Sequence, residues 1–167
     1  VGTWISSQYT WAVMDDWLEG GLVADDGIDP SATVVHGYLR SFGPVTETDV
    51  RWWTGWTATQ ARHALAAAQA TTVNLDGGRG YIANDDRFTE HSESWVAFLP
   101  GLDPATMGWK ERGWYLDATH EAQLFDRNGN GGPTIWLDGR IVGGWVQAPD
   151  GEIRYRLLDD EASVRSE

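Results

Sequence analysis

The chain contains no cysteine, and Lys110 is the only lysine among its 167 residues. Without cysteine there is no disulfide framework, no thiolate zinc site and no cysteine nucleophile. The chain also lacks an apolar run long enough to cross a membrane. Its first residues, from Val1 onward, do not show the basic stretch followed by an apolar one that marks a signal peptide. We therefore expect a cytoplasmic protein that does not contact a membrane.

Basic residues are scarce as a class. The chain has 12 Lys and Arg against 25 Asp and Glu, which gives a formal net charge of −13 at pH 7. General affinity for nucleic acids depends on neutralising phosphates with Lys and Arg, so this balance argues against it. Residues 51–80 are the one locally positive stretch, because Arg51, Arg62 and Arg79 there outnumber Asp76.

Tryptophan is the residue that the chain has in excess, with 11 copies. Small domains use large aromatic side chains to bury area that they could not otherwise bury, so we expect most of these rings to serve the core. The alternative is that one or two of them stack on nucleic-acid bases.

The first predicted helix follows Asp29, which is suited to cap it, while Pro30 is suited to its first position. Apolar residues then recur at helical spacing and define one face: Val34, Val35, Tyr38, Leu39 and Phe42. The pair Gly43-Pro44 is expected to end this helix.

Two shorter helices are predicted next. Thr46 and Asp49 begin the second helix, which should end near Gly55, and Thr57 and Gln60 form a capping box for the third. The inward-facing side chains of the second helix are expected to be Val50 and Trp53, with Trp52 as a further candidate. Two short helices joined by a tight turn with glycine match the helix-turn-helix arrangement.

A β-hairpin is predicted directly after these helices. Its strands are Thr71–Leu75 and Arg79–Ile82, and Asp76, Gly77 and Gly78 form the turn. Three helices followed by a hairpin are the order of elements in a winged helix. The sequence therefore predicts an α+β fold in which a winged helix precedes a small antiparallel, β-rich and barrel-like region.

The predicted organisation has four parts. Residues 1–28 form an N-terminal segment that continues from a missing upstream half, residues 29–83 the winged helix, residues 95–160 the antiparallel β-rich region, and residues 161–167 a tail. A short helix is possible within Trp11–Leu18. In the β-rich region the predicted strands are Trp95–Leu99, Thr134–Leu137, Arg140–Gln147 and Glu152–Leu158.

Two details of the β-rich region can be predicted from residue types. The pair Gly143-Gly144 inside a strand suggests a bulge or a sharp bend that would help to curl the sheet. Apolar residues alternate with polar or exposed positions in two of the predicted strands, which is typical of a strand with one buried face: Ile135 and Leu137 in one, and Ile153, Tyr155 and Leu157 in the other.

The strongest candidates for DNA contact lie on the third helix and the hairpin, which a winged helix would place in and beside the major groove. They are Thr59, Gln60, Arg62, His63 and Arg79. The alternative is that these residues form the solvated face of an amphipathic helix. Lys110 and Arg112 lie among tryptophans and could hold a nucleic-acid backbone, or they could extend over Trp109 and Trp114 as surface residues.

No residue pattern indicates a metal, a cofactor or a catalytic group. The four histidines are widely spaced, and none has a second ligand at a metal-binding interval: His36, His63, His91 and His120. Residues Asp126–Gly131 copy the opening of a calcium loop, but Leu137 replaces the required glutamate, so a tight turn is the better interpretation.

Four stretches of the sequence are distinctive: Thr3–Tyr9, Asp49–Thr57, Leu102–Lys110 and Asp126–Pro133. They resemble the C-terminal half of the bacterial winged helix DNA-binding domain-containing proteins. This is the family of the azinomycin-resistance and YcaQ-type DNA glycosylases, and the resemblance is to actinobacterial members in particular.

The resemblance implies a considerably longer parent protein with tandem winged helices and a barrel-like region. It also implies removal of alkylated or cross-linked bases by hydrolysis of the glycosidic bond. In the family's characterised glycosylases a Gln-x-Gln or Gln-x-Asp motif of the N-terminal half positions the water. Gln8, Gln60 and Gln147 do not begin such a motif, so no catalytic residue can be carried over.

Three hypotheses remain open at this point. The chain could be the DNA-binding, non-catalytic part of a glycosylase-like repair protein, reaching double-stranded DNA through its parent. It could come from a non-catalytic DNA-binding or regulatory protein. In the third, its winged helix packs mainly against the missing N-terminal half of the same chain.

Overall fold

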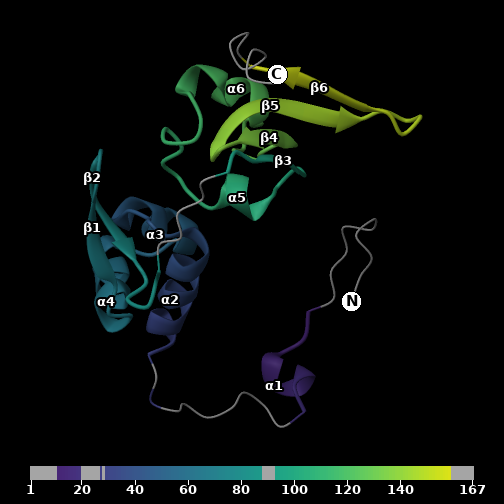
Figure 1. Cartoon of the computed structure of the whole chain (residues 1–167). Coiled ribbons are helices and arrows are strands. Elements are labelled where there is room, and N and C mark those ends of the chain that lie inside the picture. Colours follow the sequence, from purple (N-terminus) through teal and green to yellow (C-terminus); the bar gives the residue numbers. More distant parts are fainter. Residues whose placement is uncertain (1–10, 20–26, 28, 88–92, 159–167) are drawn as a thin grey trace.

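A computed structural model describes residues 11–19, 27, 29–87 and 93–158 (Figure 1). The helices are α1 (Met14–Trp17), α2 (Pro30–Phe42), α3 (Glu47–Thr54), α4 (Ala58–Ala67), α5 (Pro104–Met107) and α6 (Glu121–Leu124), with the 3₁₀ turn η1 (Ala118–His120). The strands are β1 (Thr71–Leu75), β2 (Gly78–Ile82), β3 (Val96–Leu99), β4 (Thr134–Leu137), β5 (Arg140–Gln147) and β6 (Ile153–Leu157). This mixture of helices and antiparallel sheets confirms the predicted α+β class.

Helix α2 begins where the sequence predicts. The Asp29 carboxylate accepts a hydrogen bond from the Ser31 amide (2.9 Å), and Pro30 occupies the first turn, where its missing N–H costs nothing. The face that this helix buries comprises Val35, Tyr38 and Leu39. These side chains anchor the helix in the core.

Capping boxes also open α3 and α4. The Thr46 side chain accepts from the Asp49 amide while the Asp49 carboxylate accepts from the Thr46 amide, and Thr57 and Gln60 repeat the arrangement. Between the two helices Gly55 adopts a left-handed conformation with φ of 74°, which favours glycine. These local interactions produce the short helix-turn-helix.

Strands β1 and β2 form an antiparallel hairpin directly after α4, with Thr71 opposite Ile82 and Leu75 opposite Gly78. An isolated bridge from Val45 to Tyr81 adds a third pairing to the hairpin. The hairpin lies beside α2 and α4 (Figure 1). We call α2, α3, α4 and this hairpin the helix–hairpin unit; its elements occur in the order expected for a winged helix.

The second sheet has four antiparallel strands in the order β3-β4-β5-β6. The strand at Val96–Leu99 joins the predicted meander as an edge, with Val96 opposite Leu137. The register shifts between β4 and β5 because Val142 is an extra residue on β5, next to Gly143. A bulge thus lies at the predicted bend, one residue before the glycine pair.

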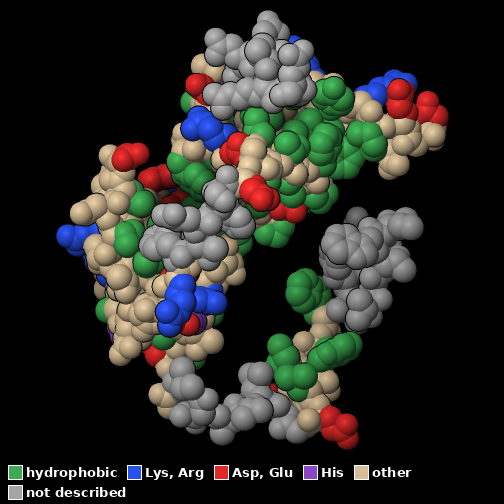
Figure 2. Space-filling model, in the orientation of Figure 1, with side chains coloured by type: hydrophobic (Ala, Val, Ile, Leu, Met, Phe, Trp, Pro, Cys, Tyr) green, Lys and Arg blue, Asp and Glu red, His purple; other side chains and the backbone are tan. Residues whose placement is uncertain are grey.

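Two expectations about this sheet were wrong. The sheet is open, because β3 and β6 do not pair with each other, whereas a barrel requires its first and last strands to close. The apolar side chains of β6 are also not buried: Ile153 is 47% exposed and Tyr155 66% exposed. Figure 2 shows hydrophobic side chains gathered over the four-stranded sheet.

The tryptophans also differ from expectation. Among the described residues only Trp109 and Trp136 are buried, and several indoles are substantially exposed. Trp53 was expected to point inward, but it is 46% exposed and stacks on the Tyr38 ring at 4.7 Å between centroids. A tryptophan is too large for a small core to cover completely, so these rings pack on one side only.

The helix–hairpin unit and the four-stranded sheet share one core. The Tyr38 hydroxyl donates to the Gly108 carbonyl (2.6 Å), and the Trp109 indole N–H donates to the Phe42 carbonyl (2.9 Å). The buried Asp49 carboxylate accepts from the amides of Lys110 (2.9 Å) and Glu111 (3.0 Å). A single cluster of buried hydrophobic side chains extends from α2 to β4 and β5.

The N-terminal helix α1 is only four residues long and buries none of them. Trp17 is 64% exposed and Met14 51% exposed. Other expectations for the ends of the chain fall on residues 1–10, 20–26 and 159–167, which lie outside the described residues. Residues 28 and 88–92 also lie outside the described residues.

Candidate nucleic-acid interface

The third helix of the helix–hairpin unit, α4, exposes all four residues predicted for DNA contact: Thr59, Gln60, Arg62 and His63. The Gln60 side chain already has a local role, because its Oε1 accepts from the amide (3.0 Å) and hydroxyl (2.8 Å) of Thr57. The two N–H donors of its side-chain amide make no hydrogen bond among the described residues and can still bind a ligand. Thr59 has no side-chain hydrogen bond among the described residues, so its hydroxyl is available.

Arg62 and His63 of α4 each have an acidic neighbour. Arg62 Nη1 lies 3.4 Å from Glu47 Oε1, and His63 Nε2 lies 2.9 Å from Asp29 Oδ2. The hydroxyl and amide of Ser31, and then His63, hold the pKa of Asp29 below its usual value. Because both contacts are exposed, solvent screens them and they hold the side chains only weakly. A phosphate could therefore replace either acid at little cost.

Arg79 is the free cation of the hairpin. It lies on β2 opposite Asn74, is exposed, and has no ion pair among the described residues. A side chain so placed can reach a phosphate without first losing a partner. Together, α4 and Arg79 form what we call the α4–hairpin surface, defined by Thr59, Gln60, Arg62, His63 and Arg79.

The two cations predicted in the next segment are in different environments. Lys110 is exposed, and its side chain has no ion pair within the described part of the chain. The Arg112 side chain is only 13% exposed, pairs with Glu121 (2.9 Å) and lies 4.0 Å over the Phe125 ring. Arg112 is therefore held within the fold, and its reach toward a phosphate is short.

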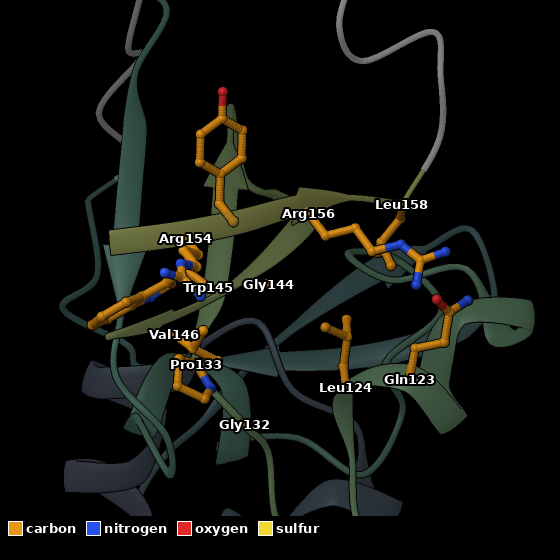
Figure 3. A pocket seen from close by; sticks show the side chains of 11 residues that line it. Gln123, Leu124, Gly132, Pro133, Gly144, Trp145, Val146, Arg154, Arg156 and Leu158 are labelled. Carbon is orange, nitrogen blue, oxygen red and sulfur yellow. The ribbon is translucent and has the colours of Figure 1, made fainter. Parts of the chain in front are cut away.

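A cavity of about 590 Å³ between α6 and strands β5 and β6 contains basic residues that the sequence analysis missed (Figure 3). Arg154 is bound by Glu152 (2.8 Å), whereas Arg156 has no acid partner among the described residues. The Arg156 and Gln123 side chains approach each other across this cavity in Figure 3. The alternation of Arg154 and Arg156 with apolar residues was the available signal, but it was used only to predict a buried face.

Basic side chains do not form one continuous surface on the face shown in Figure 2; Lys and Arg occur there in separate groups. Electrostatic attraction of DNA depends on phosphates being neutralised together. An interface on this face would therefore rely on a few placed cations rather than on a broad basic field.

The Asp126–Gly131 segment forms the predicted turn. Asp126 Oδ1 accepts from the amides of Asn128 (2.8 Å) and Asn130 (2.9 Å), and the Asn130 contacts in particular lower the pKa of Asp126. No group of three or more His, Asp and Glu side chains within the described ranges is placed to hold a metal ion. Among the same residues, no helix is both long enough and apolar enough to cross a bilayer.

With this geometry in view, the chain can be assigned to a class. The model of the family described as "DNA glycosylase AlkZ-like" matches residues 1–165, and the chain belongs to this family. The resemblance inferred from the sequence is thereby confirmed. No curated protein gave a significant match.

One similar solved structure is the Streptomyces sahachiroi DNA glycosylase AlkZ. It superposes with a TM-score of 0.65 at 22% sequence identity, covering 78% of this chain. This likeness supports the fold. The match spans 37% of the AlkZ chain, so the activity of that whole protein does not pass to this chain without a separate argument.

Proposed function

We propose that this chain is the DNA-binding, non-catalytic C-terminal part of a DNA glycosylase-like repair protein that acts on alkylated or cross-linked DNA. The observation that carries the proposal is a helix-turn-helix and hairpin in winged-helix order within a chain that belongs to the AlkZ-like family. In such folds the third helix enters the major groove and the hairpin contacts the backbone.

The contacts proposed are those of the α4–hairpin surface together with Lys110. Arg79 and Lys110 have no ion pair among the described residues, and Arg62 is held only by an exposed pair with Glu47. Arg112 is left out because Glu121 and Phe125 enclose it. The same surface on a non-catalytic DNA-binding or regulatory parent would bind DNA in the same way.

No residue of this chain is proposed to be catalytic. A glycosylase needs a group that positions or activates water at the glycosidic carbon, which this family's motif provides through glutamine. Gln69 and Gln123, like the glutamines considered above, are not followed two residues later by Gln or Asp. The catalytic centre of the parent is thus proposed to lie in a different part of that protein.

A specific observation favours a second role beside DNA binding. Trp17 is 64% exposed and Met14 51%, so α1 presents apolar side chains that the described residues do not bury. Exposed apolar patches mark interaction sites. We propose that this helix packs against the N-terminal half of the parent protein.

The test of DNA binding is a fluorescence-anisotropy titration with a short duplex at several salt concentrations. The Arg62→Ala/Arg79→Ala variant should bind more weakly and have a salt slope lower by roughly two units, because two phosphate contacts are lost. An Arg127→Ala/Arg156→Ala variant removes the same charge from exposed sites outside the α4–hairpin surface, and it should bind as the original chain does.

Three outcomes of this titration would alter the proposal. Loss of binding only in the Arg127→Ala/Arg156→Ala control would move the interface to the four-stranded sheet. Equal loss in both variants would indicate a charge effect without a defined surface. No binding at low salt would contradict DNA contact by this chain and favour a packing role for its helices.

A further inference from the structure

A second cavity, of about 540 Å³, lies where the hairpin turn approaches the loop between α5 and η1. It is bounded by the turn residues Asp76 and Gly77, by the start of α3, and by Trp109, Glu111, Gly113 and Trp114. Its size is typical of sites that bind small molecules or single side chains. None of the residues proposed for DNA contact lines it, although Lys110 lies in sequence between the lining residues Trp109 and Glu111.

Two tryptophans form aromatic walls of this cavity. Trp109 is 9% exposed, and its ring is fixed by the hydrogen bond from its indole N–H to the Phe42 carbonyl (2.9 Å). Trp114 is 52% exposed and meets Trp109 at 4.9 Å between ring centroids and 86° between planes. Because Trp114 is half exposed it can present indole surface to the cavity, and indole faces attract organic cations more strongly than other aromatic rings do.

The charges around the cavity have one sign. Asp49, Asp76 and Glu111 line it, and no Lys, Arg or His does. Asp76 and Glu111 are exposed and have no ion pair among the described residues. Carboxylates without a cationic partner, beside low-dielectric aromatic walls, produce a local field that favours a positive ligand.

Asp49 supplies a fixed negative charge in the wall. It is 2% exposed, and its oxygens accept from the amides of Thr46, Lys110 and Glu111 and from the Thr46 hydroxyl. Burial, and then the negative charge of Asp49, raise the pKa of the neighbouring Tyr38. The wall is thus negative before any ligand arrives.

We propose that this cavity binds an organic cation, a guanidinium or alkylammonium group, seated against Trp114 and Trp109 and paired with Asp76 and Glu111. The acids supply attraction, and the indoles supply a face over which a flat guanidinium can stack. The ligand can be a free small molecule or an arginine or lysine side chain of a partner protein, since both present the same group.

Isothermal titration calorimetry with two matched probes tests the proposal on the unaltered chain. N-acetyl-arginine amide carries only the guanidinium charge, and N-acetyl-citrulline amide has nearly the same shape without it. We expect saturable binding of the arginine probe and at least about tenfold weaker binding of the citrulline probe. Equal affinity for the two probes, or no binding of the arginine probe, would overturn the proposal.

Variants locate the site. Asp76→Asn/Glu111→Gln should weaken binding of the arginine probe by about tenfold, and Trp114→Leu by about fivefold. The controls are Asp15→Asn/Asp16→Asn, which removes the same charge from exposed positions on α1, and Trp52→Leu, which removes another partly exposed indole. The proposal is wrong if the controls weaken binding as much as the cavity variants do.

The source of the cation is distinguished by a second titration. An arginine-containing tripeptide with blocked ends should bind more tightly than N-acetyl-arginine amide if a protein partner is the ligand. Equal affinities of the two probes would identify a small free cation instead. Neither result depends on DNA, so a chain that fails to bind DNA can still pass this test.

Discussion

At the scale of single residues, Asp49 connects the two parts of the molecule. Its carboxylate accepts from the Thr46 amide at the start of α3, and at the same time from the amides of Lys110 and Glu111 in the loop between α5 and η1. Both oxygens of this buried carboxylate accept hydrogen bonds. A side chain that could not accept all of them would leave buried N–H or O–H donors without a partner, which destabilises the fold.

Asp49→Asn should therefore lower the free energy of unfolding by about 2–3 kcal/mol, because one amide donor would face an NH₂ group. Urea unfolding followed by tryptophan fluorescence measures the change. Asp15→Asn, at an exposed position of α1, is the control and should leave the midpoint unchanged. An unchanged midpoint for Asp49→Asn would contradict the connecting role of this side chain.

Tyr38 and Tyr115 are buried, and burial raises the pKa of both side chains, so the free energy of unfolding should fall at alkaline pH. Burial raises the pKa of Tyr115 to about 12, although the nearby Arg112 lowers it in part. Because the folded pKa lies above the unfolded value of about 10, the folded state disfavours the phenolate. The buried, protonated phenol of Tyr115 therefore contributes fully to the free energy of unfolding below about pH 10, and this contribution is lost as the pH rises through the folded pKa.

The free energy of unfolding should thus fall between about pH 10 and pH 12. Tyr115→Phe should make that fall shallower, since one ionising group is removed, and Tyr155→Phe at an exposed site should not. Urea midpoints measured across this pH range report the effect. Identical pH dependence in all three proteins would rule out Tyr115 as a source.

At the scale of elements, the helices depend on their caps. The Thr57 side chain accepts from the Gln60 amide (3.3 Å) at the start of α4. Thr57→Ala should lower stability by about 1 kcal/mol, whereas Thr59→Ala, two residues later on the exposed face, should change it by less than about 0.5 kcal/mol. Thermal unfolding followed by circular dichroism would show the difference. Equal effects would mean that the cap contributes nothing.

The helices could be predicted from the sequence because their signals are local. Each helix start is marked by a cap whose two residues are at most three positions apart in the sequence. The caps are Asp29 with Pro30 for α2, Thr46 with Asp49 for α3, and Thr57 with Gln60 for α4. The turn at Gly55 follows from the freedom of glycine at positive φ. The order of helices and hairpin was therefore predictable, and so was the α4–hairpin surface that it presents.

Features that depend on distant residues could not be predicted in this way. Nothing near Val96 indicates that its strand pairs with the one ending at Leu137, nor that the sheet stays open. The enclosure of Arg112 depends on Glu121 and Phe125, so its place among aromatic residues suggested a nucleic-acid contact that the structure does not favour. The cavity beside Trp114 likewise requires the hairpin turn and the segment 109–114 to meet.

At the scale of the whole molecule, the shared core predicts one cooperative unfolding transition. Trp109 contacts both parts: its indole N–H bonds to the Phe42 carbonyl, and its ring packs near Tyr115 with 5.8 Å between centroids. Calorimetry should show a single transition for the unaltered chain. Trp109→Ala should lower stability by about 3–5 kcal/mol because a large buried side chain is lost.

Trp52→Ala, at a partly exposed site on α3, is the matched control and should cost much less than Trp109→Ala. Two separate transitions in the unaltered chain would contradict the shared core, because each part would then unfold on its own. A large loss in Trp52→Ala would show that exposure is a poor guide to the contribution of these indoles.

The central claim is that the chain contacts duplex DNA through the α4–hairpin surface, and mapping of amide chemical shifts tests it most directly. In a titration of the ¹⁵N-labelled chain with a short duplex, the amides of α4 and β1–β2 should shift, and those of β5 and β6 should not. Shifts confined to the four-stranded sheet, or no shifts at low salt, would contradict the account.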